Sequence, residues 1–127
     1  MNRQDLAEII INETDRAKLL FMAKNKAYGS DEEAFYNFKA VAERELGSGS
    51  FENMYKGLRV AMAKHDCVLV KDGLHDPDFV ERTRDVIVYS LIALGMHAAY
   101  KAAQVPEALI TPPPAVMQPL EPEAAPC

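Results

Sequence analysis

The sequence predicts an all-α fold, in which residues 1–103 form a four-helix bundle-like domain and residues 104–127 form a disordered or extended Pro-rich tail. Four segments carry apolar residues at the spacing of one helix face. Short stretches rich in Gly, Ser and Asp separate these segments, as turns between helices do. Residues 67–70, Cys-Val-Leu-Val, are the only strand-like run, and the helical spacing continues across them. The predicted fold therefore contains no strand.

The first two helices are predicted on either side of a Tyr-Gly turn. The first covers about residues 3–26 and ends near Gly29, because glycine is a natural stop for a helix. The second covers about residues 31–46, because Ser30 followed three residues later by Glu33 fits a capping box. A very short turn is therefore expected between them.

The third and fourth helices are predicted to meet at an Asp-Gly turn. The third covers about residues 51–71, with Ser50 as its N-cap and Gly73 just after its end. The fourth covers about residues 77–102 and is expected to be capped by Asp76, which precedes a proline at the first helical position.

The charge balance differs between the predicted domain and the tail. The net charge is −5, from 19 acidic and 14 basic residues. The tail holds three of the acids, no base and seven of the eight prolines, so it cannot bury a core. The domain is nearly neutral, so its composition does not suggest the basic surface expected of a protein that binds duplex nucleic acid. A small anionic ligand is compatible with this balance, since local charges decide its binding.

No segment predicts a membrane or secretory location. The N-terminal segment has only a short apolar run, Ile9 to Ile11, which does not make a signal peptide. The apolar run at residues 86–96 is too short to span a bilayer and follows an aspartate. The two cysteines have no metal-binding spacing. A cytoplasmic, reducing location is therefore expected.

Two carboxylates, Glu81 and Asp85, lie where the fourth predicted helix becomes apolar. Residues four apart share a helix face, and a carboxylate that faces a core needs a cation. One interpretation is a pair of oxygen ligands for Mg²⁺, which prefers carboxylates and keeps waters for substrate phosphates. The alternative is that Glu81 is solvated and that Asp85 pairs with an arginine such as Arg59.

Basic residues on two other helices suggest contacts with phosphate. Lys24, near the end of the first helix, could meet phosphate oxygens as a point charge, although it also suits the negative end of the helix dipole. Arg59 and Lys64 on the third helix could neutralise the carboxylates or contact phosphate. His65 is expected at the surface, since no second histidine lies at metal-binding spacing.

The order of these motifs resembles a known family. The chain runs from a Lys-rich helix end through a Tyr-Gly turn and an Asn-Phe pair to Met-Ala-Lys, and then to Glu-x-x-x-Asp-x-x-x-Tyr in an apolar helix. This order resembles the phage and bacterial nucleotide modification associated domain, type 1. It is also similar to the all-α nucleoside triphosphate pyrophosphohydrolases of the MazG and dimeric dUTPase group. The residues that carry the resemblance are Lys24, Tyr28, Gly29, Asn37, Phe38, Lys64, Glu81, Asp85 and Tyr89.

The resemblance implies an α-helical, often oligomeric domain that handles nucleotides in phage DNA metabolism, in the host cytoplasm if the protein is phage-encoded. In the pyrophosphohydrolases, acids on helices hold Mg²⁺ on the triphosphate and a water attacks. Carried over to this chain, the catalytic residues are Glu81 and Asp85, and the Mg²⁺ ligands are these two and Glu33. The residues expected to bind the nucleotide are Lys24, Tyr28, Asn37, Arg59, Lys64 and Tyr89.

The sequence leaves the function open between an enzyme and a binding protein. The pyrophosphohydrolases carry Glu-x-x-Glu on one helix and Glu-x-x-Asp on the next. Here Arg82 lies three residues before Asp85, and no Glu-x-x-Glu occurs. The alternatives are a Mg²⁺-dependent nucleoside triphosphate pyrophosphohydrolase-like protein and a non-catalytic, nucleotide-binding oligomer, with a purely structural helical oligomer as a third. Asp85 is expected to face a polar cleft between helices, with four neighbours: Lys64, Arg59, Asn37 and Tyr28.

Overall fold

The computed structural model describes residues 1–30 and 32–106, without the side chains of residues 27 and 28. Over these residues the chain forms α-helices and one short 3-10 turn, with no strand, so the predicted all-α class is confirmed. Most of the predicted tail, residues 107–127, lies outside the described residues. The elements are α1 (Arg3–Tyr28), α2 (Tyr36–Leu46), α3 (Phe51–Asp72), η1 (Gly73–His75) and α4 (Phe79–Ala103).

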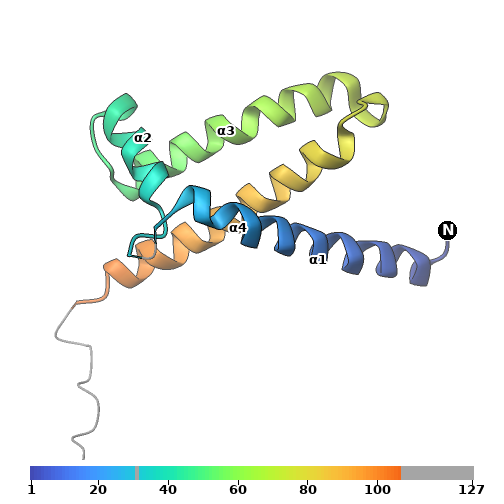
Figure 1. The fold of residues 1–127 in the computed structure, drawn as a ribbon, viewed down its shortest axis with the longest axis horizontal. Helices are drawn as coiled ribbons and strands as arrows, with labels where there is room; N and C mark the ends of the chain where they lie inside the picture. The colour runs from blue at the N-terminus through green and yellow to red at the C-terminus, as the bar shows by residue number, and fades with distance from the viewer. Residues whose placement is uncertain (31, 107–127) are drawn as a thin grey trace, which may run out of the picture.

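α3 and α4 form a helical hairpin that carries most of the packing between helices (Figure 1). α3 begins at the predicted N-cap, where the Ser50 hydroxyl accepts a hydrogen bond of 3.2 Å from the backbone N–H of Asn53. It ends at Gly73, whose φ of 55° is strained for any residue with a Cβ. Both predicted ends of this helix are confirmed to within one residue.

α4 begins at Phe79 rather than at the predicted residue 77, and its N-cap is Asp78. The expected cap, Asp76, uses its carboxylate differently. It accepts hydrogen bonds from the backbone N–H of Asp78 at 3.1 Å and from Nε of Arg82 at 3.0 Å. Because Asp76 is buried, its pairing with Arg82 offsets the cost of removing the carboxylate from water. The Asp76 cap prediction is therefore wrong, and this aspartate closes the hairpin turn instead.

α2 begins at Tyr36 rather than near residue 31. The Ser30 hydroxyl accepts the Glu33 N–H at 2.9 Å, as a capping box requires. However, the Ser30 N–H donates to the Glu33 carbonyl at 2.9 Å, which closes a turn where the helix was expected. The chain then packs back on Gly29, where an added Cβ would lie 2.5 Å from the carbonyl oxygen of Ala34. A residue larger than glycine would push this turn apart.

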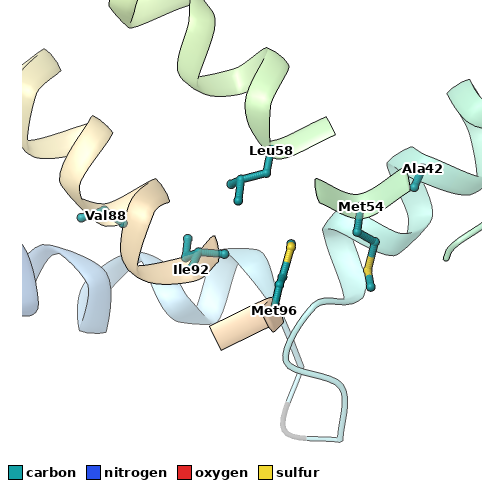
Figure 2. Packing of buried hydrophobic residues seen from close by; sticks show 6 residues of the cluster. All are labelled: Ala42, Met54, Leu58, Val88, Ile92 and Met96. Carbon is teal, nitrogen blue, oxygen red and sulfur yellow. The ribbon is translucent and has the colours of Figure 1, made fainter. Parts of the chain in front are cut away.

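The core lies where α2, α3 and α4 meet (Figure 2). Leu58 of α3 points toward Ile92 and Met96 of α4, and their side chains converge in the centre of the view. Half-buried aromatic residues from α1, α2 and α3 surround this centre. The buried members of the cluster are Ala42, Met54, Leu58, Val88, Ile92 and Met96.

α1 crosses α4, and its N-terminal half extends away from the core (Figure 1). Residues 1–12 are all exposed, including the apolar Leu6, Ile9 and Ile10. The later turns of α1 contact α4 and α2, and Ala17 there is fully buried. Only the second half of this long helix is therefore covered by the rest of the described chain.

Among the described residues, α4 is the one helix whose length and apolar composition would allow it to cross a membrane. Three of its side chains, Val88, Ile92 and Met96, belong to the core. A core helix of a soluble protein, which is mostly buried, passes the same test, whereas 17% of the apolar window of α4 is buried in the described chain. Packing against α3 accounts for the apolar residues on this side of α4.

Leu58→Ala is expected to lower the free energy of unfolding by about 2–5 kcal/mol, because it leaves a cavity at a side chain that is fully buried. That is a large share of the roughly 5–15 kcal/mol that stabilises a typical domain. Val60→Ala on the same helix is the matched control, since Val60 is 73% exposed. Chemical denaturation of both variants, followed by far-ultraviolet circular dichroism, measures the difference. Equal losses in the two variants would contradict this core.

Candidate functional site

The crossing of α1 over α4 is tied at one end by an ion pair between Glu13 and Arg84. Arg84 donates two hydrogen bonds to the Glu13 carboxylate, from Nε at 2.7 Å and from Nη2 at 3.0 Å. This two-bond geometry fixes orientation as well as distance. The pKa of Glu13 lies below its usual value, first because of these hydrogen bonds and also because the charges of Arg84 and Arg16 favour the ionised form. The same contact raises the pKa of Arg84.

A second ion pair of opposite polarity ties the other end of the crossing. Here the cation is on α1, where Lys24 Nζ lies 2.5 Å from Oδ1 of Asp85. Arg84 and Asp85 are consecutive on α4, whereas their partners Glu13 and Lys24 lie about 16 Å apart along the axis of α1. Between those positions, Ala17 lies one turn after Glu13 on the same face and is fully buried. A small residue there lets the helix backbones approach closely.

His65 of α3 completes the site from a third helix. Its side chain is buried, with the residue 7% exposed, and its Nε2 lies 3.8 Å from Oδ2 of Asp85. Nδ1 is also buried and has no hydrogen-bond partner among the described residues. The ring of Tyr89, one turn after Asp85 on α4, lies 6.1 Å from the imidazole ring, centroid to centroid. We call the four side chains of Lys24, His65, Asp85 and Tyr89 the polar junction.

The position of His65 was predicted wrongly, because the sequence argument treated it as a surface residue. A signal for burial was present. Met54, Leu58, Met62 and His65 recur at intervals of four, four and three residues, which places them on one helix face. All four are buried in the structure. The spacing of a histidine relative to an apolar stripe was therefore more informative than its distance from other histidines.

An apolar pocket with a volume of about 400 Å³ lies beside the polar junction. Its walls are mainly aromatic, from Phe21 on α1, Phe35 before α2 and Phe38 on α2. Asn25 of α1 contributes an amide to the lining. Phe21 and Asn25 flank Lys24 within one turn of the helix, so the pocket and the polar junction share the same end of α1. We call this cavity the phenylalanine pocket.

The structure brings together three of the predicted site residues, Lys24, Asp85 and Tyr89. Asp85 faces an interhelical polar site, with its partners Lys24 and His65 on two other helices; neither was among its expected neighbours. Its cationic partner is Lys24, and Arg59 makes no ion pair with it in the described chain. Arg59 is exposed instead, and its guanidinium lies 3.7 Å from the sulfur of Met62.

Four of the other predicted site residues, which are Lys64, Glu81, Glu33 and Asn37, have described positions outside the polar junction. Lys64 is exposed on α3, and Glu81 is exposed in the first turn of α4. Glu33, in the segment before α2, pairs with Lys39 of α2 at 3.2 Å. Asn37 is exposed in the first turn of α2. The side chain of Tyr28 lies outside the described residues.

Among residues 1–30 and 32–106, the three predicted Mg²⁺ ligands are not gathered into one cluster. Within residues 1–30 and 32–106, no three His, Cys, Asp or Glu side chains group closely enough to hold a metal ion. Glu33 and Asp85 each have a lysine partner, and Glu81 is exposed near the start of α4. What the polar junction offers is an ammonium group, that of Lys24, which is partly accessible to solvent and is paired with the less exposed Asp85 carboxylate.

Comparisons with protein-family models, with curated proteins and with solved structures found no match.

The ion pair between Glu13 and Arg84 is expected to make α1 docking depend on pH. Since the pKa of Glu13 is lowered in the fold, its contribution to stability is present above the pKa of an unfolded glutamate and is lost as pH falls through the lowered value. The difference in Tm between the wild type and Glu13→Gln should therefore be largest near neutral pH and should close in acid.

The matched control is Glu8→Gln, because Glu8 lies exposed on the same helix and forms no ion pair in the described part of the chain. Thermal unfolding of the three proteins at several pH values makes the comparison. A Tm difference for Glu13→Gln that stays constant into acid would show that the carboxylate charge does not hold α1.

Proposed function

We propose that the protein binds a nucleotide where α1 and the start of α2 pack on α4, with the base in the phenylalanine pocket and the phosphates at Lys24. The observation that carries the proposal is the adjacency of the two halves of this site. Lys24 of the polar junction lies within one turn of α1 of Phe21 and Asn25, which line the pocket. In this proposal the four helices are a bundle-like scaffold for the site.

The phenylalanine pocket suits a base better than it suits a sugar or a phosphate. Aromatic side chains stack on the face of any base, and such stacking contributes about 1–3 kcal/mol per base. Phe21 comes from α1, and Phe35 and Phe38 come from the start of α2. The Asn25 amide can both donate and accept hydrogen bonds, which the edge of a base requires. Ligand sites usually combine such an apolar lining with a few polar groups.

Lys24 is the proposed phosphate contact. Its side chain is 37% exposed, whereas that of Asp85 is only 13% exposed, so solvent reaches the ammonium more easily than the carboxylate. A phosphate has more charge than a carboxylate and can take its place as the lysine partner. Asp85 then keeps His65 Nε2, 3.8 Å away, as a neighbour. Lys24 and Asp85 therefore each have another partner when a ligand enters, the phosphate for Lys24 and His65 for Asp85.

Binding is proposed ahead of pyrophosphate hydrolysis. Hydrolysis by Mg²⁺ needs carboxylates grouped around the metal, and within one chain the described acids are not grouped in this way. The best-placed acid, Asp85, is already engaged by Lys24. The resemblance to the phage and bacterial nucleotide domains supports a nucleotide as the ligand and a cytoplasmic location. Release of pyrophosphate, measured below, tests hydrolysis directly.

A panel of nucleosides and nucleoside triphosphates, titrated by calorimetry with and without Mg²⁺, tests the proposal. Lys24→Met should weaken triphosphate binding about tenfold, or about 1.4 kcal/mol, and should change nucleoside binding little. Lys64→Met removes an exposed lysine that has no ion-pair partner in residues 1–30 and 32–106, and it should bind like the wild type. Equal triphosphate affinity of the two variants, or no nucleotide binding by the wild type, would contradict the proposal.

Asp85→Asn separates the binding proposal from the metal-dependent one. If Asp85 only holds Lys24, the variant should bind triphosphate more tightly in the absence of Mg²⁺, because a competing anion is gone. It should also lose about 1–3 kcal/mol of stability, because a partly buried pair is broken. If Asp85 is a metal ligand, triphosphate affinity in Mg²⁺ should fall instead. Release of pyrophosphate by the wild type, abolished in Asp85→Asn, would favour the enzyme.

We also propose that the protein self-associates through the exposed apolar side chains of α1. Leu6, Ile10, Leu19 and Met22 are between 47% and 70% exposed along this helix, and such a surface is rarely left in water. Light scattering at micromolar concentration should report a multiple of 14.1 kDa. A mass of 14.1 kDa at every concentration would contradict self-association without bearing on nucleotide binding.

A further inference from the structure

A second apolar cavity lies at the end of the α3–α4 hairpin that is away from its turn. It is formed between the first turns of α3 and the last turns of α4. Its volume is about 480 Å³, and its walls are mainly apolar. Phe51 and Tyr55 line it from α3, and His97 and Tyr100 line it from α4. The rings of Phe51 and Tyr100 meet edge to face, with centroids 6.0 Å apart. We call this cavity the tyrosine groove; it shares no lining residue with the phenylalanine pocket.

The tyrosine groove is open to water in the described part of the chain. Tyr55 is 46% exposed and Leu94, also in the lining, is 68% exposed. Glu52 and His97 bring polar groups to the lining. An exposed aromatic surface rimmed by a few polar groups is typical of a binding site for another chain segment.

We propose that the tyrosine groove binds the Pro-rich segment 111–119 of the same chain in an extended, polyproline conformation. Grooves lined by aromatic side chains bind Pro-rich segments, because the ring faces pack on prolines and the hydroxyl groups donate to free backbone carbonyls. The segment contains three consecutive prolines, 112–114. It lies within residues 108–120, which carry no charge and therefore suit an apolar groove.

The position of the segment in the chain favours its own groove. Tyr100 lies in the last turn of α4, which ends at Ala103. The α4 part of the groove, from Ala93 to Tyr100, covers about 10 Å of helix. The five residues 107–111 span about 15 Å when extended, which is enough for the chain to turn back. Residues 112–114 then lie beside the groove, antiparallel to α4.

Tethering makes this intramolecular contact favourable even if it is intrinsically weak. A short linker holds the segment at an effective concentration on the order of millimolar next to the groove. Prolines also lose little conformational freedom on binding, since their φ is already fixed. A second copy of the chain would have to compete with this local concentration.

Paramagnetic relaxation in the full-length chain tests the proposal. A nitroxide is attached through Val116→Cys after Cys67→Ser and Cys127→Ser remove the other thiols. Amide signals around Tyr55 on α3 should lose intensity relative to the reduced, diamagnetic sample. Signals around residues 5–10 on α1 should be unchanged.

The control for simple tethering replaces Pro112, Pro113 and Pro114 with glycine, which keeps the tail length and leaves the helices untouched. This variant should recover most of the lost intensity, and Tyr55→Ala should do the same. Equal broadening with and without the prolines would overturn the proposal. A second sample mixes chains that carry the nitroxide but no nitrogen-15 with nitrogen-15 chains that carry no nitroxide. Broadening in this sample would show that the segment binds a second copy, which also contradicts the proposal.

Discussion

The crossing of α1 over α4 is the constraint on which the candidate site depends. Two ion pairs of opposite polarity, Glu13 with Arg84 and Lys24 with Asp85, diverge from adjacent residues of α4. If α1 slid along α4, neither Glu13 nor Asp85 would meet a new cation at the same spacing. The two ion pairs therefore specify the position of α1 along α4 more than they contribute to stability. Ala17, buried between them, allows the close approach that brings Lys24 to Asp85.

The hairpin of α3 and α4 supplies the rigid half of the same site. Leu58, Val88 and Ile92 hold the two helices together by burial, which is not directional. Direction comes from the polar groups at the His65 end of the hairpin, where Asp76 fixes the turn through Arg82 and Asp85 lies close to His65. Arg82 pairs with the buried carboxylate of Asp76, a structural role that an acid could not fill.

The elements of the fold were largely predictable, and the site was predictable only in part. Helical period and the Ser50 cap located α3 to within one residue, because both signals are local. The starts of α2 and α4 were misplaced, because Ser30 and Asp76 satisfy their usual local hydrogen bonds inside turns rather than at helix ends. The partner of Asp85 lies 61 residues away on α1, and no spacing rule reports on such a contact.

The position of Asp85 answers why a carboxylate lies at the edge of an apolar helix. Val88 and Ile92, one and two turns later, are buried against α3, so the face that carries Asp85 leads directly into the core. With an uncharged residue there, the pair between Glu13 and Arg84 would be the remaining described ion pair between α1 and α4. A carboxylate accepts only an arrangement that brings it a cation, and Lys24 on α1 is that cation. The same charge that selects the docked position of α1 therefore also holds, at the surface, the ammonium group that the proposed ligand would take.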